Sequence, residues 1–325
     1  MPMTDRAPAI SVIVPAYGVA HLLPEALASL QAQDFQDWEA VVIDDGAPDD
    51  VAGAVAKFAG DSRIRLVQTD NGGVSTARNR AVAASRAPLL AMLDGDDLLE
   101  PDYLAKMIAV MDADATLGFV TCDAVYFGAP EREGHRFSRY APQAEPVTLD
   151  RVLAREFNVY IGTVVRRNAY DQVNGFDAKL GAAEDLDLWI RLLEAGWKGA
   201  YVAQPLGRYR RRPNSNSWDE ARMLRYAEQV YLNSAQRLGT RPEAATSQRM
   251  LEHIRRKLRW IEGESLIRAG RPREGVALLS DAHADQRSLR WRLAMPLMRR
   301  MPWLAPMLIH IRLWLPPLFP FTSEW

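Results

Sequence analysis

Short apolar segments alternating with helical patterns constrain the fold of this chain more than any other feature. The apolar segments cover residues 10–15, 38–43, 64–68 and 89–93. Between them, the apolar residues have the spacing of amphipathic helices over residues 21–33, 49–58 and 75–85. Continuous apolar strands connected by helices are typical of a parallel sheet with both faces covered. The sequence therefore predicts an α/β fold with a doubly wound, mostly parallel sheet.

Polar and acidic residues follow each of the four predicted strands. They are Pro15-Ala16-Tyr17, Asp44-Asp45-Gly46, Asp70-Asn71-Gly72-Gly73 and Asp94-Gly95-Asp96-Asp97. Ligands bind to such sheets at the carboxyl ends of the strands. These residues are therefore expected to gather around one site.

The character of the chain changes near residue 217. Before that residue, strands are predicted at 119–127, 163–166 and 200–202, and a helix is predicted at 184–195. The later residues are mainly helical, and two of their helices, at 249–269 and 273–279, are predicted to form a helical hairpin. Residues 1–215 carry 22 Lys and Arg against 30 Asp and Glu, but residues 216–325 carry 18 against 11. This reversal of charge predicts two domains, residues 1–217 and a helical region at 218–325.

The bulk composition predicts a soluble protein of a reducing compartment. Of the 325 residues, 48% are hydrophobic and 25% charged, which is ordinary for a globular protein. Cys122 is the only cysteine, so no disulfide can form within the chain. The N-terminus has no basic segment followed by an apolar one, as a secretory signal would. We therefore expect a cytoplasmic protein.

Two carboxylates two residues apart, Asp94 and Asp96, end the fourth predicted strand. Mg²⁺ and Mn²⁺ prefer such oxygen ligands and keep open positions for phosphate oxygens. Asp and Gly are also favoured in turns for conformational reasons alone. Either a metal site or a simple turn fits this motif.

Three further segments admit both a functional and a structural interpretation. A carboxylate of Asp44-Asp45 could accept a hydrogen bond from a nucleobase or a ribose, or the segment could simply begin a helix. Residues 72–80 could bind phosphate through the helix N-terminus and Arg78, or the glycines could only make a turn. In Glu184-Asp185-Leu186-Asp187, acids suit a first helical turn, yet one of them could act as a general base.

Six segments in this order resemble the family-2 glycosyltransferases of GT-A fold. They are VIVPAYG, VVIDDG, GGVSTARNRA, LLAMLDGDDLLEPDYL, GFDAKLGAAEDLDLWIRLLEAGW and YRRRPNSNS, over about residues 8–217. The resemblance implies a GT-A, Rossmann-like catalytic domain that transfers a sugar, with inversion, from a nucleotide diphosphate. It also implies a Mn²⁺ or Mg²⁺ cofactor, a donor that is most simply a UDP-sugar, and a glycan or lipid-linked acceptor.

The resemblance assigns roles to individual residues. The residues assigned to binding of the nucleotide-sugar are Pro15, Ala16, Tyr17, Asp44, Asp45, Arg78, Asp94 and Gly95. Asp96, with Asp94, is assigned to the metal, and Asp185 is assigned as the catalytic base. The residues assigned to the acceptor side or the diphosphate are Glu184, Trp189, Arg210 and Arg212. Two positions depart from the family's pattern. Ala47 stands where a serine is usual, and Arg212 stands where a histidine is often found. Arg212 could supply positive charge to the diphosphate, or the arginine run could be a solvated loop.

Residues 287–325 mix tryptophan and arginine with aliphatic residues and proline. The stretches without charge are shorter than the ~20 residues that a spanning helix needs. Arginine and tryptophan suit the headgroup layer of a membrane. The tail is therefore expected either to lie on the inner face of a membrane or to pack against protein.

Other classes of function fit less well. A nucleotidyltransferase would need a phosphate-binding loop after the first strand, and no dinucleotide-binding glycine motif follows it either. No nucleic-acid-binding module is recognisable. A catalytically inactive protein that binds sugar nucleotides, or a scaffold, remains the alternative, although Asp94, Asp96 and Asp185 are all present.

Overall fold

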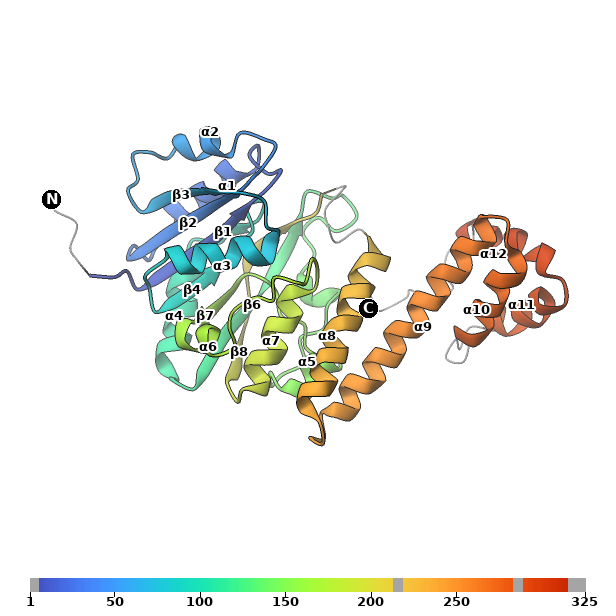
Figure 1. Ribbon diagram of the computed structural model, residues 1–325. Helices are drawn as coiled ribbons and strands as arrows, with labels where there is room; N and C mark the ends of the chain where they lie inside the picture. The colour runs from blue at the N-terminus through green and yellow to red at the C-terminus, as the bar shows by residue number, and fades with distance from the viewer. Residues whose placement is uncertain (1–5, 213–218, 283–288, 315–325) are drawn as a thin grey trace. The chain divides into compact units, whose positions relative to one another are not determined.

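The computed structural model describes residues 6–212, 219–282 and 289–314. It contains two compact units, Met1–Trp218 and Asp219–Trp325 (Figure 1). The predicted tail belongs to the second unit, and its residues 287–288 and 315–325 lie outside the described residues.

The first unit is built on one eight-stranded sheet. Its strands are β1 (Ile10–Ala16), β2 (Trp38–Asp45), β3 (Ile64–Thr69), β4 (Leu89–Met92), β5 (Leu98–Leu99), β6 (Leu117–Phe127), β7 (Thr163–Arg166) and β8 (Lys198–Arg210). Their spatial order is β3-β2-β1-β4-β7-β6-β8-β5. The first four strands in this order are parallel, and β6 pairs with β8 in parallel too. Only β7 and β5 run antiparallel to their neighbours.

Helices cover both faces of this sheet. They are α1 (Leu23–Gln31), α2 (Val51–Ala56), α3 (Val74–Ala84), α4 (Tyr103–Ala113), α5 (Leu149–Leu153), α6 (Arg167–Gln172) and α7 (Glu184–Glu194). Val12 and Val14 of β1 share one core with Leu27 of α1 and Met107 of α4. On the other face α3 packs against β1 and β2. Side chains alternate between the faces of a strand, so strands covered on both faces are apolar throughout, as the sequence predicts.

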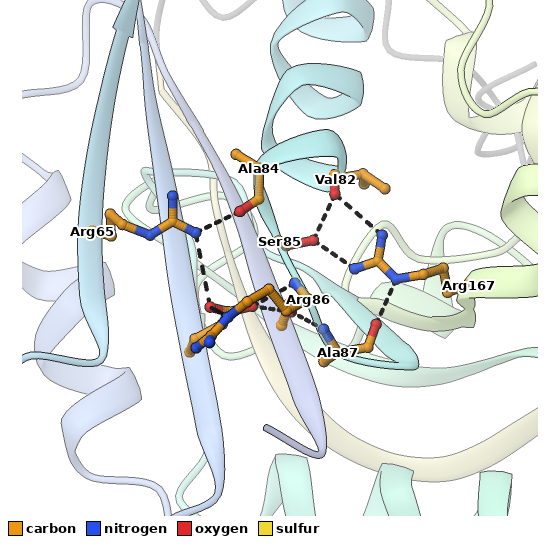
Figure 2. Close-up of polar contacts among 9 residues, drawn as sticks. Arg65, Val82, Ala84, Ser85, Arg86, Ala87 and Arg167 are labelled. Carbon is orange, nitrogen blue, oxygen red and sulfur yellow. Dashed lines mark hydrogen bonds and ion pairs between the residues drawn. The ribbon is translucent and has the colours of Figure 1, made fainter. Parts of the chain in front are cut away.

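The turn from α3 into β4 is fixed by arginines from both sides (Figure 2). Arg167 donates to the carbonyl oxygens of Val82 and Ala87, over 3.1 and 2.6 Å, and to the hydroxyl of Ser85 over 2.7 Å. Arg65 of β3 donates to the carbonyl oxygen of Ala84 over 2.5 Å. These bonds satisfy the last carbonyl groups of α3, which a helix end leaves without partners. They set the position of α3 relative to the sheet.

The second unit is helical. It comprises α8 (Glu220–Leu238), α9 (Ala244–Arg268), α10 (Pro272–Ala282), α11 (Leu289–Arg300), the 3₁₀ turn η4 (Pro302–Leu304) and α12 (Ala305–Trp314). Its core is a separate apolar cluster that includes Trp260 and Ile267 of α9, Leu279 of α10 and Met298 of α11. Within the described residues, no helix combines the length and the apolar character needed to cross a membrane.

Candidate functional site

The ends of β1, β2 and β4 lie side by side at one edge of the sheet. Ala16 pairs with Asp44 across β1 and β2. Ile13 pairs with Met92, so Pro15 and Asp94 each follow that pair by two residues. Gly95 permits the close approach of the two loops, since a Cβ on it would lie 3.0 Å from the carbonyl oxygen of Pro15. The residues predicted to follow these strands are thus brought together.

The carboxylate of Asp45 holds the loop that leads into α3. Its two oxygens accept hydrogen bonds from the backbone N–H groups of Gly72 and Gly73, each over 2.9 Å. Asp44 accepts from the N–H of Ala47 over 2.9 Å and from the amide of Gln68 over 3.2 Å. Both carboxylates are buried and serve these loops. By contrast Tyr17, at the end of β1, is 55% exposed and presents its ring to solvent.

Arg78 of α3 links two parts of the site that are far apart in sequence. One guanidinium nitrogen lies 2.6 Å from a carboxylate oxygen of Asp94, and another lies 2.6 Å from Glu184. The side chain is only 3% exposed. Burial by itself would lower the pKa of Arg78, but the charges of Asp94 and Glu184 raise it above its usual value. Arg78 thus ties the end of β4 to the first turn of α7.

That first turn of α7 carries the acids predicted from the sequence. Burial raises the pKa of Glu184, and the charge of Arg78 opposes this shift. Asp185 is partly exposed, and one of its oxygens accepts from the N–H of Leu186 over 2.7 Å. Within the described residues Asp185 makes no ion pair, whereas Asp187 pairs with Arg191 over 2.7 Å. Asp185 is therefore the acid of this turn that remains available to a ligand.

Trp189, further along α7, is buried in the core. It is 1% exposed, and its ring centroid is 5.2 Å from that of Phe119 on β6. Three positions separate it from Leu186 on the buried side of α7, so the helix turns it into the core. The sequence assigns Trp189 to the acceptor side, but burial leaves its ring no surface with which to touch an acceptor.

Two arginines at the end of β8 hold the acidic motif after β4. The Nε of Arg212 lies 2.7 Å from a carboxylate oxygen of Asp96. Arg210 donates from its Nε to the carbonyl oxygen of Asp96, and from its backbone N–H to Asp97, each over 2.8 Å. Burial and the charge of Asp94 raise the pKa of Asp96, while Arg212 opposes this. The predicted arginines therefore do reach the site, where they contact carboxylates.

Asp97 and Tyr160 are constituents of the site that sequence reasoning did not single out. The hydroxyl of Tyr160 donates to Asp97 over 3.3 Å. Burial and the charges of Asp96 and Asp94 raise the pKa of Asp97 well above its usual value. The only sequence feature that indicated a role for Asp97 is its position in the acidic motif. No sequence feature indicated Tyr160, which is distant from that motif in the chain.

A divalent cation fits this motif only together with a ligand that supplies further oxygens. Among the described residues, no group of three or more His, Cys, Asp or Glu side chains could hold a metal ion. Asp94 and Asp96 lie close enough for the charge of one to raise the pKa of the other. Mg²⁺ typically takes one or two carboxylates and completes its shell with phosphate oxygens and water. The two aspartates suit that arrangement, provided that Arg212 yields its place on Asp96.

Comparison with known proteins identifies relatives of this chain. The sequence profile of glycosyl transferase family 2 matches residues 11–173. An uncharacterised protein of Sinorhizobium fredii, y4gI, is 32% identical over 58% of this chain and 21% of its own length. The hyaluronan synthase of Pasteurella multocida is 26% identical over 59% of this chain and 19% of its own length. The match thus spans about a fifth of each of these relatives.

A shorter relative matches over most of its length. The putative teichuronic acid biosynthesis glycosyltransferase TuaG of Bacillus subtilis is 25% identical over 68% of this chain and 87% of its own length.

Solved structures share the fold. S. aureus TarS 1–349 in complex with UDP-GlcNAc has a TM-score of 0.64 and 19% identity, over 92% of this chain and 87% of TarS. The mannosyltransferase PcManGT of Pyrobaculum calidifontis, in complex with GDP-Man and Mn²⁺, has a TM-score of 0.59 and 20% identity, over 95% and 88%. The prediction of a GT-A fold followed by a helical region is therefore confirmed.

Proposed function

Because the chain belongs to glycosyl transferase family 2, we propose that it transfers one sugar from a nucleotide diphosphate to an acceptor hydroxyl, with inversion at the anomeric carbon. The observation that carries the proposal is the double ion pair of Arg78 with Asp94 and Glu184, at 2.6 Å each. Asp96 lies two residues beyond Asp94, and Asp185 directly follows Glu184. A candidate metal ligand and a candidate base thus belong to one site.

The donor is proposed to bind at the edge formed by β1, β2 and β4. The exposed ring of Tyr17 suits stacking on a nucleobase, and Pro15, Ala16, Asp44, Asp45 and Gly95 lie at the same edge. Two proteins of this fold were solved with nucleotide-sugars, TarS with UDP-GlcNAc and PcManGT with GDP-Man. We propose a UDP-sugar for this chain, with Arg210 and Arg212 near the diphosphate.

A divalent cation is proposed to enter with the donor. Asp96 would hold it directly, with Asp94 beside it, and PcManGT was solved with Mn²⁺. When bound, such a cation neutralises charge on a diphosphate leaving group. The positive side chains of Arg210 and Arg212 add to the same effect from the protein itself.

Asp185 is proposed as the general base. Its carboxylate would take the proton from the acceptor hydroxyl, whose oxygen then forms a bond to the anomeric carbon. The bond from that carbon to the diphosphate breaks on the opposite face, and the configuration inverts. Glu184 cannot serve as easily, because Arg78 already occupies one of its oxygens.

The acceptor is proposed to be a glycan or a lipid-linked sugar in the assembly of a surface polysaccharide. Hyaluronan synthase and TuaG are named for the synthesis of such polymers. We also propose that the protein works in the cytoplasm and lies peripherally on the inner face of the membrane. The unpaired, buried thiol of Cys122 fits a reducing compartment, and the basic second unit fits an anionic surface.

The substitution Asp185→Asn tests the proposal. It removes the base but keeps the size of the side chain, so the transfer rate should fall about 100-fold or more. Donor affinity, measured by thermal shift across a panel of UDP- and GDP-sugars with Mn²⁺, should change little. Asp171→Asn on α6, which removes the same charge from an exposed site, is the control and should transfer normally.

Wild-type rates in the Asp185→Asn variant would contradict the role of the base. A wild-type chain that binds a sugar nucleotide and turns over none of the panel would instead be the inactive binding protein.

A further inference from the structure

The exposed large hydrophobic side chains of this protein are concentrated in one short segment. Leu293, Leu297, Met301, Trp303 and Met307 are 69, 42, 43, 69 and 55% exposed. Among the described residues the only other one is Tyr17, at the proposed donor site. We call these five side chains the apolar face of α11–η4–α12. Soluble proteins rarely gather so many apolar side chains on their surface unless something covers them.

Other side chains of the same elements are already packed in a core. Met295 and Met298 of α11, with Ala305 and Ile309 of α12, belong to the core of the second unit. That core also contains Leu279 of α10, next to which α11 and α12 lie (Figure 1). The five exposed side chains therefore do not belong to the unit's own core, which other residues of the same elements fill. A helix that is apolar on two sides is expected to have a partner on each.

The positive charge beside the apolar face indicates which kind of surface covers it. Arg299 and Arg300 are exposed at the end of α11, between Leu297 and Met301 of the apolar face. The sequence has no Asp or Glu from residue 286 to residue 323. A second copy docked through the same segment would therefore offer these arginines no carboxylate from that segment. An anionic lipid surface accepts arginine at the headgroups and Leu, Met and Trp just beneath them.

We propose that the apolar face of α11–η4–α12, with Arg299 and Arg300, docks on an anionic lipid bilayer. The elements lie along the surface, the five apolar side chains enter the boundary between headgroups and acyl chains, and the arginines contact lipid phosphates. This inference deepens the proposed function, since it identifies the part of the chain that brings the enzyme to a lipid-linked acceptor. It rests on the exposure of apolar side chains and on the charge of arginines in the second unit, so it is independent of the catalytic site.

Flotation of the full chain on lipid vesicles tests the docking. The protein should rise with vesicles of phosphatidylcholine and phosphatidylglycerol, and stay behind with phosphatidylcholine alone. Leu297→Glu should weaken binding to the anionic vesicles by at least about tenfold, because it removes a buried apolar contact and adds a repelled charge. Gln236→Glu adds the same charge at an exposed position of α8 and should float like the wild type.

A second variant tests the charge separately. Arg299→Gln with Arg300→Gln should weaken binding about 25-fold at low salt, from about fivefold for each arginine near an anionic surface. Added salt should weaken wild-type binding and affect this variant less. Circular dichroism of each variant should match that of the wild type, which excludes loss of fold as the cause.

Two results would overturn the inference. One is wild-type protein that does not float with anionic vesicles. The other is a dimer in light scattering that Leu297→Glu dissociates, since the face would then be covered by a second copy. Donor turnover with a soluble acceptor is measured on the same samples. If flotation fails while turnover persists, only the docking is wrong; if flotation holds without turnover, only the proposed function is wrong.

Discussion

Three arginines pair with four carboxylates of the candidate site. Arg78 pairs with Asp94 and Glu184, Arg212 pairs with Asp96, and Arg80 lies 3.4 Å from Asp45. Carboxylates this close together repel one another, and each guanidinium reduces that cost. Arg78, Arg80 and Arg212 thus already pair with carboxylates of the site, and a cation that binds Asp96 would compete with Arg212.

Arg212→Ala tests this competition at Asp96. The Nε of Arg212 occupies the oxygen that a cation would use, at 2.7 Å. Without it, the weak affinity for Mn²⁺ alone should rise by up to about fivefold, which corresponds to the roughly 1 kcal/mol that a partly exposed ion pair contributes at most. The affinity for the donor with Mn²⁺ should fall, because a positive charge near the diphosphate is lost. Thermal shift titrations of Mn²⁺, with and without donor, measure both.

Arg211→Ala is the matched control, because it changes the net charge by the same amount at the neighbouring position. Its Mn²⁺ affinity should stay at the wild-type value. If Arg212→Ala also leaves Mn²⁺ affinity unchanged, the ion pair with Asp96 does not compete with the cation.

The sequence predicts which polar residues gather at the site, but not what each one contacts. Asp44 and Asp45 end β2, Asp94 and Asp96 follow β4, and strand ends meet at one edge of a parallel sheet. Their partners come from distant segments: Arg210 reaches Asp96 across 114 positions and Glu184 reaches Arg78 across 106. Such pairings depend on how the loops pack, which periodicity does not encode.

At the scale of elements, we propose that the reaction depends on the ion pairs through which Arg78 of α3 joins the first turn of α7 to the loop after β4. Asp185 is carried by the first turn of α7, and the bridge through Arg78 fixes that turn relative to the acidic motif. Misplacing a catalytic group by a fraction of an ångström is enough to reduce a rate. We therefore propose Arg78 as a positioning residue, while its assignment to the nucleotide by the family resemblance stays a prediction.

Arg78→Lys separates these two roles. Lysine keeps the charge, but its single ammonium group cannot reach two carboxylates in the fixed geometry of a guanidinium. We expect kcat to fall by about 100-fold while the KM for the donor stays within about threefold. Arg86→Lys, an exposed position just after α3, makes the same change away from the site and is the control. A large rise in KM with kcat preserved would instead show that Arg78 binds the nucleotide.

Elements were predictable where the apolar pattern is uninterrupted. β1, β2, β3 and β4 begin at the expected residues, and β7 has the predicted bounds. β8 extends over Lys198–Arg210, far beyond the predicted 200–202, because half-exposed polar residues and register shifts opposite Asp123 interrupt its pattern. α4, which fills the core through Tyr103 and Met107, was not predicted, since its apolar run does not distinguish a helix from a strand.

At the scale of the whole molecule, each unit has its own hydrophobic core. The cluster containing Val12, Leu27 and Met107 belongs to the first unit, and the cluster containing Trp260, Leu279 and Met298 belongs to the second. The predicted change at residue 217 lies next to the division between Trp218 and Asp219. We propose that the two units are separate domains, one that binds the donor and one that binds the membrane.

Calorimetry of the full chain tests this division of labour. Separate cores should give two unfolding transitions, and a ligand stabilises only the unit that binds it. Donor with Mn²⁺ at a hundredfold excess over Kd adds about 2.7 kcal/mol, which should raise one transition by roughly 5–10 °C and leave the other in place. Anionic vesicles should raise the other transition instead, and Leu297→Glu should abolish only that second shift. A single transition that moves with either ligand would mean that the units fold as one cooperative body, because stabilisation of one would then be transmitted in full to the other.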